Sequence, residues 1–246
     1  MMGGWSAVIG EFVGTFVLIV LGNGVVAGAL LNRSKAQNAG WISITAGWAI
    51  AVFAGVAVSA ALGDADGHLN PAFTVASVMM TGHAERLFTY IPAQILGALC
   101  GAVVVWLHYK PHWKLTEDAD AKFACFATAP AVDAAGWNLL SEIIGTFVLV
   151  LIATALFSKR IAPAGVAPGL GPVLVGSLVW GIGLSLGGTT GYAINPARDL
   201  GPRLAHALLP VAGKGSSGWR YAWIPVIGPV LGAMLAVAVI RGLKMF

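Results

Sequence analysis

The residues best placed for chemistry in this sequence are two asparagines, each followed by the same two residues. Asn70-Pro71-Ala72 recurs as Asn195-Pro196-Ala197. Asn is a preferred helix N-cap and Pro is favoured at the first helical position, so each tripeptide predicts the start of a helix. A helix start carries unpaired backbone N–H groups and about half a positive charge. Together with the Asn amides, these groups can donate hydrogen bonds to a polar molecule.

The composition indicates that the elements positioning these asparagines lie in a membrane. Of 246 residues, 58% are apolar and only 10% are charged, whereas about a quarter are charged in a soluble domain. The 33 Gly and 9 Trp are also typical of helical membrane proteins. This composition excludes a soluble enzyme, a disordered chain and a disulfide scaffold. The net charge of +4 is too small and too scattered to indicate nucleic-acid binding.

Six apolar stretches are long enough to cross a membrane, which takes about 20 apolar residues. They cover residues 6–31, 41–62, 87–107, 139–157, 170–186 and 222–240. A long polar loop, residues 108–136, separates the third stretch from the fourth. Two further stretches, 71–80 and 196–209, look helical but are too short to cross, and each begins with one of the Asn-Pro-Ala tripeptides.

An internal repeat relates the two halves of the chain. Residues 11–18 recur as residues 142–149 with six of eight positions identical, at an offset of 131, and the tripeptides recur at an offset of 125. Each half, about 6–107 and 137–242, contains three spans and one half-helix. Because three is odd, the second half must enter the membrane from the opposite face. The sequence therefore predicts one all-α membrane domain over residues 1–246, built as an inverted repeat.

Inversion predicts a polar path at the centre of the membrane. Non-helical backbone at membrane depth survives only where it is buried in protein or lines a water-filled cavity. Two half-helices that enter from opposite faces bring Asn70 and Asn195 together there. Glu11 and Glu142 lie within spans at repeat-related positions, and we expect each to accept hydrogen bonds from a pore loop's backbone. We expect His68 to hold its loop or to line the path.

These motifs make the chain similar to the major intrinsic protein family, the aquaporins and aquaglyceroporins. Residues 67–72, Gly-His-Leu-Asn-Pro-Ala, resemble the family's first pore loop, and residues 191–199, which end in Asn-Pro-Ala-Arg-Asp, resemble the second. The resemblance implies six tilted transmembrane helices with two re-entrant half-helices, and a homotetramer with one pore per subunit. It implies neither an enzyme nor a cofactor or metal. It also implies a multi-pass protein of the bacterial plasma membrane with both termini cytoplasmic, an orientation that the Lys and Arg of the loops do not support.

The resemblance also implies a selectivity filter made of four residues. They are Trp48, Gly183, Tyr192 and Arg198, and this pattern resembles that of glycerol facilitators. Gly183 would leave room for a second aromatic ring, so that Trp48 and Tyr192 form an apolar corner facing the donors of Arg198. Asp199, which directly follows Arg198, also resembles the glycerol type, and we expect it to brace the loop. The implied function is a passive channel for glycerol, water and other small neutral solutes that excludes protons and ions.

Several alternatives remain open at this point. Tyr192 replaces the Phe usual in bacterial glycerol facilitators, and its hydroxyl either faces the lumen or bonds to nearby backbone. The main solute could instead be undissociated lactic acid, urea, dihydroxyacetone or hydrogen peroxide. A secondary transporter is a further alternative, because broken helices and inverted repeats also build those. The acidic loop 63–68 is either a cation-attracting or gating element or a solvated turn.

Overall fold

The computed structural model describes residues 2–63 and 66–245, which form helices and connecting loops. The helices are α1 (Met2–Leu30), α2 (Gly40–Ala61), α3 (Pro71–Thr81), α4 (Glu85–His108), α5 (His112–Leu115), α6 (Ala119–Ala124), α7 (Ala135–Leu156), α8 (Leu170–Leu186), α9 (Pro196–Leu208) and α10 (Ile224–Gly242). Every predicted span and both half-helices are present. In the described part of the chain, five helices are long and apolar enough to cross a membrane. The fifth predicted span, α8, has 17 residues, which is the lower end of the usual range of about 17–25 for a membrane span.

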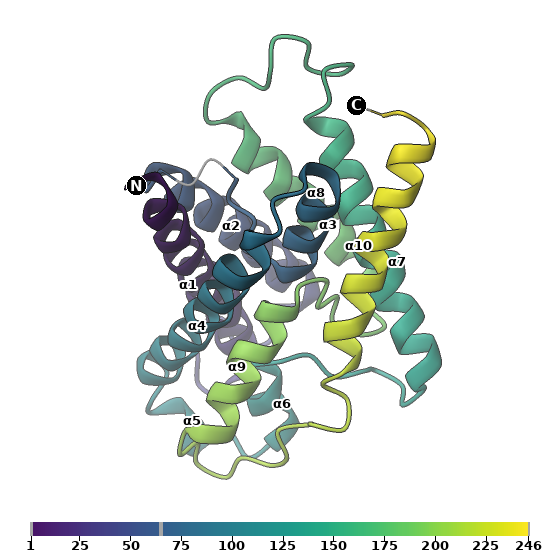
Figure 1. The fold of residues 1–246 in the computed structure, drawn as a ribbon. Coiled ribbons are helices and arrows are strands. Elements are labelled where there is room, and N and C mark those ends of the chain that lie inside the picture. The colour runs from purple at the N-terminus through teal and green to yellow at the C-terminus, as the bar shows by residue number, and fades with distance from the viewer. Residues whose placement is uncertain (1, 64–65, 246) are drawn as a thin grey trace.

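The long helices surround the two half-helices, and the arrangement repeats in the two halves. α1 packs against α2 and α4, just as α7 packs against α8 and α10. Each half-helix then crosses to the other repeat, because α3 packs against α10 and α9 packs against α4. Figure 1 shows α3 and α9 in opposite halves of the molecule and both chain termini at the same end. This is the inverted repeat that the sequence predicts.

Glycines allow the helices within each repeat to approach closely. A Cβ built on Gly101 of α4 would lie 2.7 Å from the carbonyl oxygen of Phe16 in α1, and one built on Gly228 of α10 would lie 2.6 Å from the Cβ of Glu142 in α7. Small residues at such contacts are how helices pack in an apolar solvent, where no hydrophobic force drives them together. Each repeat thus has a close glycine contact between its first and third long helices, α1 with α4 and α7 with α10.

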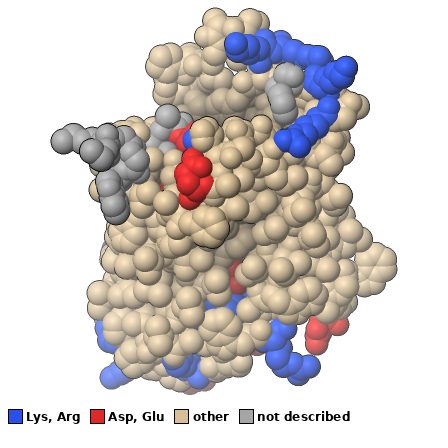
Figure 2. Space-filling model, in the orientation of Figure 1, with Lys and Arg blue, Asp and Glu red and all other residues tan. Residues whose placement is uncertain are grey.

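The surface of the bundle has the form expected of a protein in a bilayer. Figure 2 shows Lys and Arg gathered at the two ends, with a broad belt of uncharged residues between them. Large apolar side chains such as Ile42, Phe88 and Trp137 are exposed. An exposed apolar surface of this extent indicates contact with lipid or with another membrane protein.

The connection 108–136 differs from the polar loop that the sequence predicts. It contains the short helices α5 and α6, and Trp113, Phe123 and Phe126 are buried. The difference arises because aromatic residues lie between the charged ones and pack over the end of the bundle. There His206 of α9 contacts the rings of Phe123 and Phe126 at centroid distances of 5.3 Å and 5.2 Å. The connection is therefore a folded cap.

Two lysines bind backbone carbonyls at this same end of the molecule. Lys122 donates from its Nζ to the carbonyl oxygens of Ala212 and Gly213 at 2.7 Å and 3.1 Å. Lys214 donates to three carbonyls at the end of α9, at 2.7–2.8 Å; these belong to His206, Ala207 and Leu209. A cation at a helix C-terminus is favourable. Because Lys122 and Lys214 stabilise the fold, they are poor indicators of which side of the membrane their loops occupy.

Candidate pore and its filter residues

The two asparagines cap the half-helices as their sequence context predicts. Asn70 has extended backbone (φ −155°), and its side-chain oxygen accepts from the N–H of Ala72 at 2.9 Å. Asn195 is equivalent (φ −152°) and accepts from Ala197 and Arg198 at 3.0 Å and 3.2 Å. Each amide oxygen is thereby fixed toward its own helix. The amide nitrogen must then point away from that helix.

Each amide nitrogen donates to the loop of the other repeat. Asn70 Nδ2 donates to the carbonyl of Ile194 at 2.8 Å, and Asn195 Nδ2 donates to the carbonyl of Leu69 at 2.8 Å. Leu69 and Ile194 have left-handed backbone, with φ of 50° and 42°. This conformation is strained in residues with a branched side chain and persists only where the surroundings enforce it. An amide nitrogen carries two hydrogens, so each Asn keeps one for a molecule in the lumen.

The two intramembrane carboxylates hold these strained loops in place. Glu11 accepts from the N–H groups of His68 and Leu69 at 2.6 Å and 2.7 Å. Glu142 accepts from the N–H groups of Ala193 and Ile194 at 2.9 Å and 2.8 Å. Both carboxylates are buried, and hydrogen bonds to a charged acceptor are stronger than neutral ones. The contacts are those that the sequence predicts from the repeat.

Polar partners of these carboxylates were missed by sequence reasoning. Gln94 of α4 donates from Nε2 to Glu11 at 2.8 Å and to the hydroxyl of Thr74 at 2.9 Å. In the other repeat, Thr190 donates to Glu142 at 2.7 Å. Gln94 could have been found as the amide within the apolar stretch 87–107. The sequence does not show which face of the helix carries Gln94, and that face decides whether it contacts Glu11.

One continuous cavity of about 710 Å³ runs past both asparagines. Asp66 and His68 line one part of it, and Trp48, Tyr192 and Arg198 line another. Most of its wall is apolar, with a few convergent polar groups, as is typical of small-molecule sites. His68 also lies 3.1 Å from the Thr74 hydroxyl through Nδ1, so it both lines the cavity and contacts its half-helix.

The acidic stretch 63–68 is only partly described, because residues 64 and 65 of the predicted gating or solvated element lie outside the described residues. Asp66 forms an ion pair with Arg86 at 2.7 Å. It also accepts a hydrogen bond from the hydroxyl of Tyr90 at 3.2 Å. These contacts tie Asp66 to α4.

Three of the four predicted filter residues line the cavity together. The guanidinium of Arg198 lies over the Trp48 ring, 4.1 Å from its centroid. Arg198 and Tyr192 are both mostly buried. In the part of the chain that the structure describes, Arg198 Nη1 and the Tyr192 hydroxyl are buried without a hydrogen-bond partner. Buried polar atoms rarely lack a partner, so each such atom calls for an explanation.

The fourth residue, Gly183, lies behind Tyr192 and leaves room for its ring. A Cβ at Gly183 would lie 2.8 Å from Tyr192 Cζ and 3.0 Å from both its hydroxyl oxygen and Thr45 Cγ2. The hydroxyl therefore faces α8. Trp41, which sequence reasoning missed, holds the other side: its ring meets that of Tyr192 edge-on at 5.8 Å, and its Nε1 donates to the Gly183 carbonyl at 3.0 Å.

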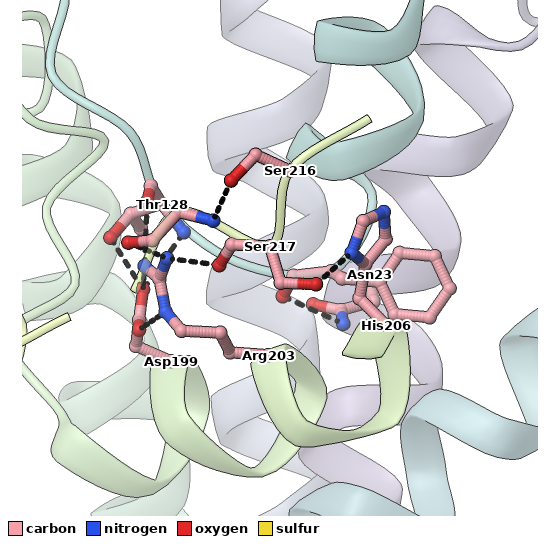
Figure 3. Close-up of polar contacts among 9 residues, drawn as sticks. Asn23, Thr128, Asp199, Arg203, His206, Ser216 and Ser217 are labelled. Atoms are coloured by element: carbon pink, nitrogen blue, oxygen red, sulfur yellow. Dashed lines mark hydrogen bonds and ion pairs between the residues drawn. The ribbon is translucent and has the colours of Figure 1, made fainter. Parts of the chain in front are cut away.

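A buried ion pair braces the second pore loop against the cap. Asp199 and Arg203, one turn apart on α9, are paired at 2.7 Å and are fully buried. Asp199 also accepts from the N–H and hydroxyl of Thr128 at 2.9 Å and 2.6 Å. Arg203 donates in addition to the carbonyls of Thr128, Ser217 and Gly218, each at 2.9 Å. Figure 3 shows this network, in which Arg203 joins three segments of chain.

Two half-helices that meet at their N-termini, inside a bundle of apolar helices and beside a continuous cavity, define a pore-forming membrane protein. The family model described as "Major intrinsic protein" matches residues 2–240. The chain therefore belongs to the major intrinsic protein family.

Known relatives and a solved structure agree with this assignment. The chain is 54% identical to glycerol uptake facilitator protein 3 of Lactiplantibacillus plantarum, over 92% of each chain. It is 51% identical to a probable glycerol uptake facilitator protein of Thermotoga maritima, over 95% of this chain and 97% of the relative. Its fold is similar to the X-ray structure of the aquaglyceroporin from Plasmodium falciparum. That match has a TM-score of 0.83 and 28% identity, and covers 96% of this chain and 94% of the other.

Proposed function

We propose that this protein is a passive channel through which glycerol, water and other small neutral solutes cross the bacterial plasma membrane. The observation that carries the proposal is the pairing of an apolar wall with free donors. Trp48 and Tyr192 line one part of the cavity, and Arg198 beside them has a buried nitrogen without a partner among the described residues. A polyol has carbons along one edge and hydroxyls along the other, so it fits such a site lengthwise. The names of the relatives support the same solute.

Osmotic swelling of proteoliposomes tests the proposal directly. The panel is glycerol, water, urea, dihydroxyacetone, hydrogen peroxide and undissociated lactic acid. We expect glycerol flux to rise linearly with its gradient and to be independent of ion gradients. Saturable flux that depends on an ion gradient would favour a secondary transporter. If glycerol flux is slow and another solute on the panel crosses faster, that solute rather than glycerol would be the main one.

The same proteoliposomes are expected to exclude protons while they conduct glycerol. Asn70 and Asn195 each keep one amide hydrogen for the lumen, and a water that accepts from both cannot relay a proton. Positive half-helix ends and an Arg are barriers known to exclude protons in channels of the aquaporin type. An internal pH dye, with valinomycin present to remove the membrane potential, should report the leak of protein-free liposomes. A proton flux that grows with protein density would contradict this prediction.

The position of the Tyr192 hydroxyl gives a second expected result. It lies beside Gly183 and is buried without a described partner, so we expect it to pack against α8 and Tyr192→Phe to remove no contact with the solute. We expect the glycerol-to-water permeability ratio to stay within about twofold of wild type. A clear shift in the ratio at equal protein density would show that the hydroxyl turns toward the solute.

We also propose that the protein assembles as a homotetramer with both termini cytoplasmic. Exposed apolar side chains around the bundle are compatible with such an assembly; those on α2 and α8 include Trp41, Ile42, Ile50, Trp180 and Leu184. The shared end of the two termini in Figure 1 is compatible with this topology. Light scattering of the detergent-solubilised protein would give the number of subunits, and labelling of single cysteines on either side would give the orientation.

A further inference from the structure

The position of Arg198 depends on the ring beneath it. Its guanidinium makes no hydrogen bond to the protein in the described part of the chain, and it lies 4.1 Å from the centroid of the Trp48 ring. The neighbouring Asp199 is engaged by Arg203 and Thr128. A guanidinium stacks well on an indole face, and the attraction is largest when both are desolvated. The plane of the Trp48 ring therefore sets where the Arg198 donors lie in the cavity.

The Trp48 ring in turn lies directly on the backbone of α1. A Cβ built on Gly22 of α1 would lie 2.5 Å from Trp48 Cη2 and closer still to Cζ3 and Cε3. Both Gly22 and Trp48 are buried. The absence of a side chain at Gly22 lets the ring lie back against α1.

We propose that Gly22 is a specificity-determining positioning residue for the filter. The Trp48 ring packs against Gly22, and the position of that ring determines both the space for a solute and the position of Arg198. The inference rests on the proposed function, since it assumes that Trp48 and Arg198 select the solute. It adds to the four filter residues a fifth position that never touches the lumen.

The expected consequence of a methyl group at Gly22 follows from this geometry. A contact under 3.0 Å with a rigid ring cannot be relieved by a small adjustment, so the ring must move away from α1. Arg198 and the cavity also border the ring, so we expect this movement to narrow the space beside them. A solute with a carbon backbone needs the room that is lost, whereas water needs much less. The change should therefore appear as altered selectivity.

Gly22→Ala compared with Gly24→Ala tests the proposal. Gly24 lies on the same helix, and a Cβ there meets no described atom within 4 Å, so it controls for the gain in helix propensity. We expect Gly22→Ala to lower glycerol permeability about tenfold or more, the scale of one misfitting methylene in an apolar pocket. Water permeability should fall less than about threefold, and Gly24→Ala should match wild type within about twofold. Failure of the wild type to conduct glycerol would refute the proposed function, whereas equal selectivity of the two Ala variants would refute this inference alone.

A double-mutant cycle with Trp48→Phe tests whether Gly22→Ala acts through the Trp48 ring or through a general effect on folding. Phe lacks the outer part of the indole that meets Gly22, so Gly22→Ala should change the glycerol-to-water ratio little in the Trp48→Phe background. Equal effects in both backgrounds would overturn the proposal. If Gly22→Ala does not fold, recovery of folded protein in the double variant would support the contact between Gly22 and the Trp48 ring. Failure of both to fold would place the crowding elsewhere and overturn it.

Discussion

Arg203→Met is expected to remove about 3–5 kcal/mol of folding free energy, the usual cost of leaving one partner of a buried ion pair without the other. Arg203 and Asp199 are fully buried, so removing the guanidinium leaves the carboxylate without its counter-charge and away from bulk solvent. The substitution also leaves the carbonyls of Thr128, Ser217 and Gly218 without their shared donor. Thermal unfolding in detergent should show a large drop in midpoint, together with a low yield of protein that can be reconstituted.

Two further variants make this result specific to the ion pair. Arg220→Met removes an exposed arginine and should leave the midpoint nearly unchanged, since most surface substitutions have effects within about 0.5 kcal/mol. Asp199→Asn combined with Arg203→Met should recover part of the loss, because no isolated charge then remains in the interior. A double variant as unstable as Arg203→Met alone would show that the lost carbonyl contacts, rather than the buried charge, carry the cost.

The parts of the structure that the sequence predicts are those set by local rules. Span length follows from apolar runs, and the ends of α3 and α9 follow from an N-cap Asn and a Pro at the first helical position. The contacts of Glu11 and Glu142 were predicted because the repeat places both at equivalent depth. These inferences need only the chain's own pattern and the thickness of a bilayer.

The remaining features depend on which faces of the helices contact one another. The residue pattern of the sequence does not contain this information. Gln94, Trp41 and Gly22 all act across a contact with another segment, and their spacing along their own helices carries no sign of it. The crossed bonds from Asn70 and Asn195 to the opposite loops are of the same kind. The cap was missed because charge dominates residues 108–136, although their buried aromatic residues decide how they pack.

Glu142→Gln is expected to lower glycerol permeability about tenfold or more, since each 1.4 kcal/mol corresponds to a factor of ten. The carboxylate accepts from the N–H groups of Ala193 and Ile194 and from the Thr190 hydroxyl. An amide has one acceptor oxygen, and its NH2 group would face a backbone donor. One unsatisfied buried donor costs about 1–3 kcal/mol, and the loop can escape it only by leaving its strained left-handed turn at Ile194. The carbonyl of Ile194 then no longer holds Asn70.

Glu11→Gln should have the same effect, because Glu11 contacts His68 and Leu69 in the equivalent way. Glu117→Gln changes an exposed residue and serves as the control.

Measuring glycerol and proton flux on the same proteoliposomes distinguishes two roles for the buried carboxylates. If they hold the loops, both Gln variants lose glycerol permeability, and proton flux stays at the level of protein-free liposomes or rises as the asparagine pair is disturbed. If they carried protons, the wild type would show a proton flux that the Gln variants lose, with glycerol permeability intact. The hydrogen bonds to loop N–H groups favour the first outcome, because the oxygens of both carboxylates are already engaged by fixed backbone donors of the pore loops.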